Sequence, residues 1–137
     1  MAIGDLAPVP QTAQQQGLNV NVRTMTVSAA GMIFQGAVDK ITAFAGGGQA
    51  SAVLLSAMVN RLTTVATAAD SVKLPPAIMG ASISVFNDAA ANSANVFPAV
   101  GETINALAAN VAFALAAGKN VCFESAVNGK WHAILSA

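Results

Sequence analysis

The stretch that decides the fold is Ser71–Ala137, which reads SVKLPPAIMGASISVFNDAAANSANVFPAVGETINALAANVAFALAAGKNVCFESAVNGKWHAILSA. Short alternating apolar runs are separated at close intervals by turn residues. The last two runs are joined by Asn128-Gly129, the strongest short-range signal for a β-hairpin. We count about eight to ten short strands over the chain, which predicts an all-β fold, a β-sandwich or a small barrel of the jelly-roll type.

Alternation within single runs shows which side chains these strands bury. In the run Ala81–Phe86, Ile83 and Val85 alternate with serines. Val121 and Phe123 are predicted to face one way, with Cys122 and Glu124 on the other face.

The first half of the chain is less decided. Leu18–Val27 alternates and predicts a strand with one solvated face. Met32–Phe44 fits either a short helix or two short strands. Ser51–Asp70 has helical spacing of its large apolar residues, yet Leu62–Val65 is β-branched and typical of a strand.

Residues 1–17 predict an extended N-terminal arm ahead of a single β domain, residues 18–137, with a glycine-rich loop at 46–48. Pro8 and Pro10 favour extended backbone and oppose a helix. Gln11–Gln16 adds a polar spacer with little to bury. The arm is either a disordered terminus or a segment that becomes ordered on a neighbouring subunit.

The composition indicates a protein that is covered by partners. Hydrophobic residues make up 55% of the chain and charged residues 9%, against about 25% charged in a typical domain. A free monomer would therefore expose an apolar surface and tend to aggregate. We expect a homo-oligomer or a component of an assembly.

The charge balance and the lengths of the apolar runs argue against nucleic-acid binding, a membrane span and secretion. The net charge is zero, with Lys and Arg scattered, so we expect no nucleic-acid partner. No apolar run reaches the roughly 18 residues of a membrane span, and the N-terminus lacks the pattern of a secretory signal. A single cysteine, Cys122, is compatible with a reducing cytoplasm.

The residues that could support chemistry are few and separated. His132 is the one histidine and Cys122 the one cysteine, so the chain offers no cluster of metal ligands. Glu102 and Glu124 are the one carboxylate pair considered for glycoside hydrolysis, but a sugar cleft would lack tyrosine and have a single tryptophan. We expect no enzyme activity, no cofactor and no metal.

A succession of short motifs carries a resemblance to a known family. The motifs are listed here in chain order: Asn60–Val65, Ala69–Pro75, Ser82–Asn87, Asn95–Pro98, Gly101–Asn105, Leu115–Lys119, Phe123 and Asn128–His132. In order and spacing this region, residues 60–132, resembles the small β-domains of tailed double-stranded DNA bacteriophages. Such domains occur as capsid cement or decoration proteins and in head or tail fibre modules.

The resemblance implies strands rather than a helix over Ser51–Asp70. It also implies a non-enzymatic virion protein, made in the host bacterial cytoplasm, that binds the capsid exterior and stabilises it. The partners would be the major capsid protein and further copies of the chain, as a homo-dimer or homo-trimer. The expected contact residues lie in the arm and the first strand: Asp5, Leu6, Pro8, Pro10, Leu18, Val20 and Val22.

Two alternatives remain open at this stage. A head or tail fibre β-module that binds host-surface glycans shares the same kind of domain. A small β-barrel enzyme or ligand carrier is disfavoured by the scarce aromatic residues and the lack of a ligand cluster.

Overall fold

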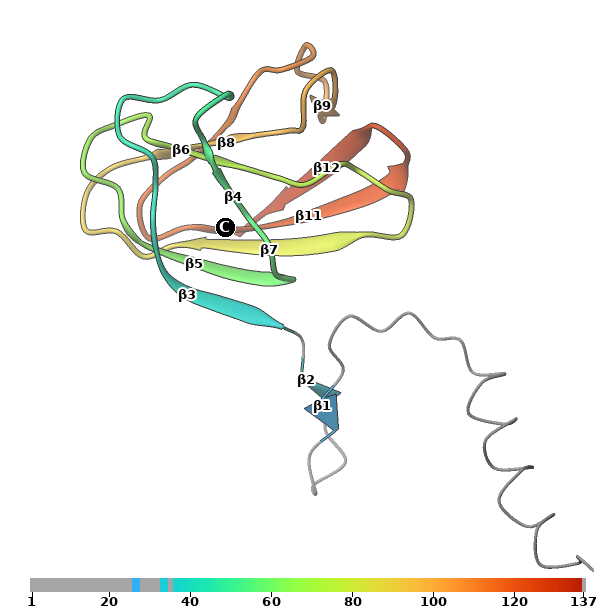
Figure 1. Ribbon diagram of the computed structural model, residues 1–137, viewed down its shortest axis with the longest axis horizontal. Helices are drawn as coiled ribbons and strands as arrows, with labels where there is room; N and C mark the ends of the chain where they lie inside the picture. The colour runs from blue at the N-terminus through green and yellow to red at the C-terminus, as the bar shows by residue number, and fades with distance from the viewer. Residues whose placement is uncertain (1–25, 28–32, 35, 137) are drawn as a thin grey trace, which may run out of the picture. The chain divides into compact units, whose positions relative to one another are not determined.

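The computed structural model describes residues 26–27, 33–34 and 36–136, and these residues form strands and loops with no helix (Figure 1). The all-β prediction is confirmed. The chain divides into two units between Phe34 and Gln35. The strands, in chain order, are β1 (Thr26–Val27), β2 (Ile33–Phe34), β3 (Ala37–Thr42), β4 (Val53–Leu54), β5 (Val59–Thr64), β6 (Ser71–Lys73), β7 (Ser82–Asn87), β8 (Ala94–Phe97), β9 (Thr103–Ile104), β10 (Phe113–Leu115), β11 (Asn120–Val127) and β12 (Lys130–Leu135).

The first unit contributes one described element, the antiparallel pair β1–β2, in which Thr26 lies opposite Phe34. Of the strand predicted over 18–27, only the last two residues are described, and they form β1. The arm, residues 1–17, lies outside the described residues and stays a prediction. The ambiguous segment Met32–Phe44 contains two short strands, β2 and β3.

The second unit begins with three coils that wind between two sheets. The strands β3, β5 and β7 lie parallel in one sheet, while β4, β6 and β8 lie parallel in the other. Each coil thus returns the chain to the same sheet one strand further along. Parallel neighbours need a crossover connection, and here a strand of the opposite sheet provides it.

The last four strands extend both sheets with mostly antiparallel pairing. β10 adds to β8 in the four-stranded sheet, and β11 and β12 add to β7 in the six-stranded sheet. β9 is the edge strand of that sheet and pairs in parallel with β12. The predicted hairpin at Asn128-Gly129 is confirmed, since Val127 pairs with Lys130 and Gly129 has a φ of 81°.

The predicted jelly-roll connectivity is not what the structure has. A jelly roll is built from antiparallel Greek keys. In the second unit, by contrast, five strand pairs are parallel: β3–β5, β4–β6, β5–β7, β6–β8 and β9–β12. The physical reason is that the loops between β3 and β8 carry the chain across to the other sheet. Within the second unit, only the β11–β12 turn connects consecutive strands as a tight hairpin.

The core lies between the two sheets. Leu62 and Val85 of the six-stranded sheet and Val72 and Val96 of the four-stranded sheet are fully buried. Phe113 of β10 meets Phe123 of β11 edge to face, with ring centroids 5.7 Å apart and planes at 86°. Trp131 is fully buried, and its indole N–H donates to the Pro75 carbonyl at 3.3 Å. The alternation predicted for β11 is confirmed, because Val121 and Phe123 are buried while Glu124 is exposed.

The conflict over Ser51–Asp70 is resolved in favour of strands, β4 and β5. Leu62 is buried on β5 while Arg61 on the opposite face is exposed, which is the two-residue period of a strand. β5 lies between β3 and β7 in the sheet. Pairing on both sides therefore overrides the helical spacing of the apolar residues.

Candidate functional site

Of the polar side chains that were candidates for chemistry, Glu102 supports a loop. The Glu102 carboxylate accepts the Ala77 N–H, with Oε2 2.9 Å and Oε1 3.1 Å from the nitrogen. A carboxylate engaged in this way holds the β6–β7 loop in place. Glu124 lies on the exposed face of β11, opposite His132 of β12 and Ser82 of β7. The structure therefore gives each glutamate a separate environment and supplies no shared cleft for the two.

Asp70 is the most engaged carboxylate, and it holds the glycine-rich loop. It is fully buried, and it accepts the Thr67 hydroxyl at 2.6 Å, the Thr67 N–H at 3.0 Å and the Gly46 N–H at 3.3 Å. These hydrogen bonds, that from the Thr67 hydroxyl first, lower the pKa of Asp70 below its usual value. The hydrogen bond from the Gly46 N–H thus ties the loop 46–48 to the turn between β5 and β6.

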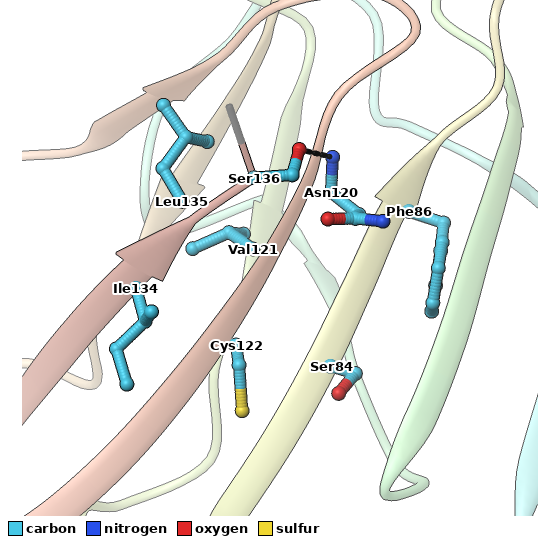
Figure 2. Close-up of a pocket in the computed structure, with 8 residues that line it drawn as sticks. All are labelled: Ser84, Phe86, Asn120, Val121, Cys122, Ile134, Leu135 and Ser136. Atoms are coloured by element: carbon cyan, nitrogen blue, oxygen red, sulfur yellow. Dashed lines mark hydrogen bonds between the residues drawn. The ribbon is translucent and has the colours of Figure 1, made fainter.

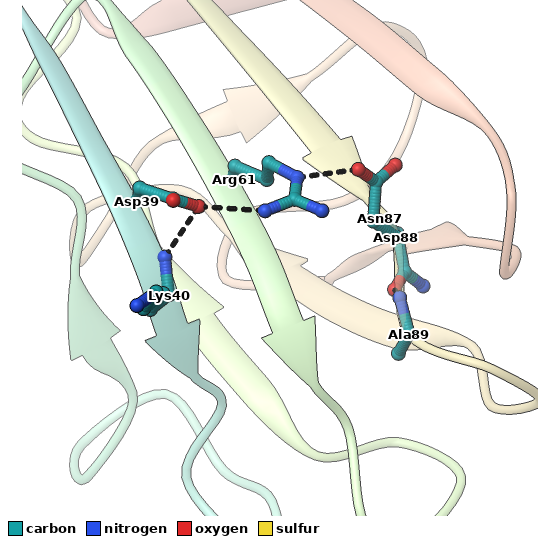
Figure 3. Close-up of polar contacts among 6 residues, drawn as sticks. All are labelled: Asp39, Lys40, Arg61, Asn87, Asp88 and Ala89. Atoms are coloured by element: carbon teal, nitrogen blue, oxygen red, sulfur yellow. Dashed lines mark hydrogen bonds and ion pairs between the residues drawn. The ribbon is translucent and has the colours of Figure 1, made fainter.

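A small ion cluster lies on the open face of the six-stranded sheet (Figure 3). Arg61 donates to Asp39 at 2.9 Å and also to Asp88. The Arg61 hydrogen bond, followed by that from the Lys40 N–H, lowers the pKa of Asp39, and the bonds to Asp88 and Asp39 raise the pKa of Arg61. All three side chains are over 40% exposed. Such pairs contribute little stability and suggest a solvated edge rather than a binding site.

His132 and Cys122 are both half-buried on β12 and β11. Cys122 is a free thiol, with its sulfur 3.6 Å from the Ser82 hydroxyl. Among residues 36–136 and the four described before them, no group of three His, Cys, Asp or Glu side chains could hold a metal ion. In the same part of the chain, no helix is long and apolar enough to cross a membrane.

One buried polar atom in the described part of the chain lacks a partner, the Asn60 side-chain oxygen. Asn60 is fully buried on β5, and its amide nitrogen donates to the Ala57 carbonyl at 2.7 Å. Asn60 lines neither of the two surface hollows around β11 that are described below. The side chain is therefore part of the core, where it anchors the β4–β5 loop.

The predicted contact residues lie outside the described residues and are not placed. These are Asp5, Leu6, Pro8, Pro10, Leu18, Val20 and Val22.

The strongest candidate surface is a group of apolar side chains at one end of the six-stranded sheet. We call Ile78, Met79, Val100 and Val127 the apolar tip. Val100, Met79 and Ile78 are the three most exposed large apolar residues described, at 77%, 69% and 65%, and Val127 is 52% exposed. Single exposed apolar residues are ordinary, but a group of them marks an interaction site.

Hydrogen bonds bring these residues together from three separate loops. The Met79 N–H donates to the Asn128 side-chain oxygen at 2.8 Å, and the Gly80 N–H to the Ser125 carbonyl at 2.8 Å. The Gly129 N–H donates to the Ala77 carbonyl at 2.9 Å. Glu102, two residues after Val100, is bound to Ala77. The loops that carry the tip are therefore tied to one another by hydrogen bonds.

A shallow hollow lies at the other end of β11 (Figure 2). Its volume is about 270 Å³. It is lined by Ser84 and Phe86 of β7, Asn120, Val121 and Cys122 of β11, Ile134 and Leu135 of β12, and Ser136. None of these lining residues is charged, and Ile134 and Leu135 are 57% and 50% exposed. A second hollow, of about 280 Å³, lies beside the tip around Ser82 and Glu124.

Comparisons with known proteins give no relative for this chain. No family model matches it, and neither the curated proteins nor the solved structures include a significant match.

Sequence reasoning missed the tip, although one signal for it was present. Pro75-Pro76 and Gly80 mark a loop, yet Ile78 and Met79 lie between them. Large apolar residues in a loop are unexpected unless something covers them. Methionine commonly fills gaps in cores, yet Met58 and Met79 are 42% and 69% exposed.

Proposed function

We propose that this protein is a non-enzymatic structural protein of a tailed double-stranded DNA bacteriophage. It binds the outer surface of the capsid and stabilises contacts between major capsid protein subunits. It is made in the host bacterial cytoplasm and acts on the virion as a homo-oligomer. The proposal does not depend on jelly-roll connectivity, because any two-sheet domain with a suitable contact surface can do this.

The observation that carries the proposal is the apolar tip. Its side chains are exposed, while the loops beneath them are held by side-chain and backbone hydrogen bonds. A surface that is already ordered loses little conformational entropy on binding. This is the property expected of a module that is covered in its working state.

Two further observations support a contact role over catalysis. The resemblance spans residues 60–132, which all lie in the second unit. Within that unit Asp70 and Glu102 hold loops, and Arg61, Asp39 and Asp88 form an exposed cluster. Asp70 and Glu102 are therefore engaged in holding loops, whereas Asp39, Asp88 and Glu124 are exposed.

The mechanism is the burial of apolar surface across the seams between coat subunits. Each oligomer touches several coat subunits at once, so individually weak contacts add up through high effective concentration. Separating the capsomers then requires breaking all of these contacts together.

Purified protein should co-sediment with capsids of the phage that encodes it and raise the temperature at which they break open. Failure to bind such capsids, together with specific saccharide binding on a glycan array, would instead support the fibre module.

A further inference from the structure

We propose that Asn128 is a site of spontaneous backbone modification, held unreactive in the folded protein by the β6–β7 loop. Asparagine is one of the thermolabile residue types. In an Asn-Gly sequence the glycine nitrogen can attack the asparagine side-chain carbonyl carbon, because glycine has no side chain to obstruct the approach. Asn128-Gly129 is the one Asn-Gly pair in the chain. This inference goes beyond the proposed function and does not depend on it.

The reaction needs no reagent other than water. The Gly129 nitrogen forms a bond to Cγ of Asn128, the bond from Cγ to the side-chain nitrogen breaks, and that nitrogen leaves as ammonia with the proton that Gly129 gives up. Water then opens the resulting succinimide ring at either of its two carbonyl carbons. The product is aspartate, or isoaspartate, in which the backbone runs through the former side chain.

Two hydrogen bonds in the structure oppose the first step. The Gly129 N–H donates to the Ala77 carbonyl at 2.9 Å, so the attacking nitrogen is engaged. The Asn128 side-chain oxygen accepts the Met79 N–H at 2.8 Å, which holds the carbonyl group that would be attacked. We therefore expect ring closure only when both hydrogen bonds have opened.

The loop that provides these two partners is itself held by the rest of the domain. The Ala77 N–H donates to the Glu102 carboxylate at 2.9 Å. The Gly80 N–H donates to the Ser125 carbonyl at 2.8 Å. The β6–β7 loop therefore has to separate from the β11–β12 hairpin before the reaction can begin. The rate of modification in the folded protein then measures how often this loop opens.

The modification would change the surface that carries the apolar tip. Asn128 is exposed and Gly129 is half-buried, so water reaches the turn once the loop has opened. Isoaspartate lengthens the backbone by one atom inside a turn whose flanking residues, Val127 and Lys130, are paired. Either product also places a carboxylate among three segments that contain no Asp, Glu, Lys or Arg: 75–81, 99–101 and 126–129.

Incubation of the full-length protein in mildly alkaline buffer tests the inference directly. Trypsin releases residues 120–130 by cleavage after Lys119 and Lys130. Mass spectrometry of this peptide follows conversion of Asn128 from amide to acid, with Asn120 as an internal reference. The folded protein should react about tenfold more slowly, or more slowly still, than the same chain unfolded in urea. An equal rate in the two states, or no reaction in urea, overturns the inference.

A matched pair of variants tests the role of the β6–β7 loop. Glu102→Ala removes the acceptor of the Ala77 N–H and should speed the reaction in the folded protein about threefold or more, the factor expected from loss of one hydrogen bond. Glu124→Ala removes the same charge from an exposed position on β11 that is nearer in sequence to Asn128, and it should leave the rate unchanged. In urea both variants should react at the wild-type rate.

A third variant separates opening of this loop from a loss of overall stability. Gly47→Ala strains the loop 46–48 beside Ala69. It should lower the unfolding midpoint without speeding the reaction of Asn128. The inference is overturned if Gly47→Ala speeds the reaction as much as Glu102→Ala does, or if the two glutamate variants react at the same rate.

Discussion

At the residue scale, several polar side chains in the described loops accept backbone N–H groups. Asp70, Glu102 and Asn128 accept N–H groups from loop residues, and Asn105 accepts the Ala133 N–H at 2.9 Å. These residue types are common in turns for this reason. The sequence shows where the turns lie, but it does not show which distant amide each side chain accepts.

Gly47 should be the least replaceable glycine of the loop 46–48. It has a φ of 67°, and a Cβ there would lie 3.1 Å from the Ala69 carbonyl oxygen. Gly118 has a similar φ of 73° with open space around it. We expect Gly118→Ala to cost about 1–2 kcal/mol of unfolding free energy for the left-handed backbone, and Gly47→Ala to cost more. Urea unfolding of both variants measures this, and equal losses would contradict the close contact.

Asp70 should make stability depend on acid. The hydrogen bonds from Thr67 lower its folded-state pKa below the ordinary aspartate value of 3.8, so its stabilising effect is fully present above that value. The effect is lost as the pH falls below 3.8 and through the folded pKa. Asp70→Asn should therefore unfold at lower urea concentration than wild type at pH 6, with the gap narrowing below about pH 3.8. A gap that is constant from pH 6 to pH 2.5 would show that the charge of Asp70 is not involved.

At the element scale, strand positions were predicted better than strand pairing. The alternation predicted within 81–86 and 121–124 falls on β7 and β11, and Asn128-Gly129 forms the expected turn. Pairing direction was missed because a turn signal ends a strand without saying to which sheet the chain goes next. Val72, for example, pairs in parallel with both Val53 and Val96, which lie in different coils.

Sequence gave less information about the candidate surface than about the fold. Ile78 and Met79 look like core residues by composition, and only their loop position indicates otherwise. The hollow combines residues from β7, β11 and β12, and its position depends on a register between strands that no local pattern contains.

The two sheets should be energetically coupled through Phe113 and Phe123. Their edge-to-face contact joins β10 of one sheet to β11 of the other. A double-mutant cycle with leucine at both positions should give a coupling of about 0.5–1.5 kcal/mol. Phe97 is the control, because its neighbour Val96 is fully buried and successive strand residues face opposite ways. Phe97→Leu should be additive with Phe123→Leu, and additivity in both cycles would contradict the packing.

At the scale of the whole molecule, two exposed surfaces account for part of the high apolar content of the chain. The tip and the hollow expose large apolar side chains at the two ends of β11. Because only 9% of the residues are charged, the chain has little charge repulsion to keep such surfaces from associating in solution. Oligomerisation and binding to a capsid each cover part of this area.

The arm should act in particle binding rather than in folding of the second unit. The core residues of that unit lie between Ile41 and Trp131, so deleting residues 1–17 should leave its unfolding midpoint nearly unchanged. Occupancy on capsids should fall, because an extended segment can add to an exposed sheet edge of a partner. Unchanged occupancy in a co-sedimentation experiment would remove Asp5, Leu6, Pro8 and Pro10 from the contact surface.

The most direct test of the proposed function is to locate the protein in intact particles of the phage that encodes it. Cryo-electron microscopy, with mass spectrometry of the same particles, should place it on the capsid exterior at icosahedral positions. We expect roughly one copy per coat subunit, so that its many weak contacts act together. Its absence from particles, or its presence in the tail alone, would contradict the account.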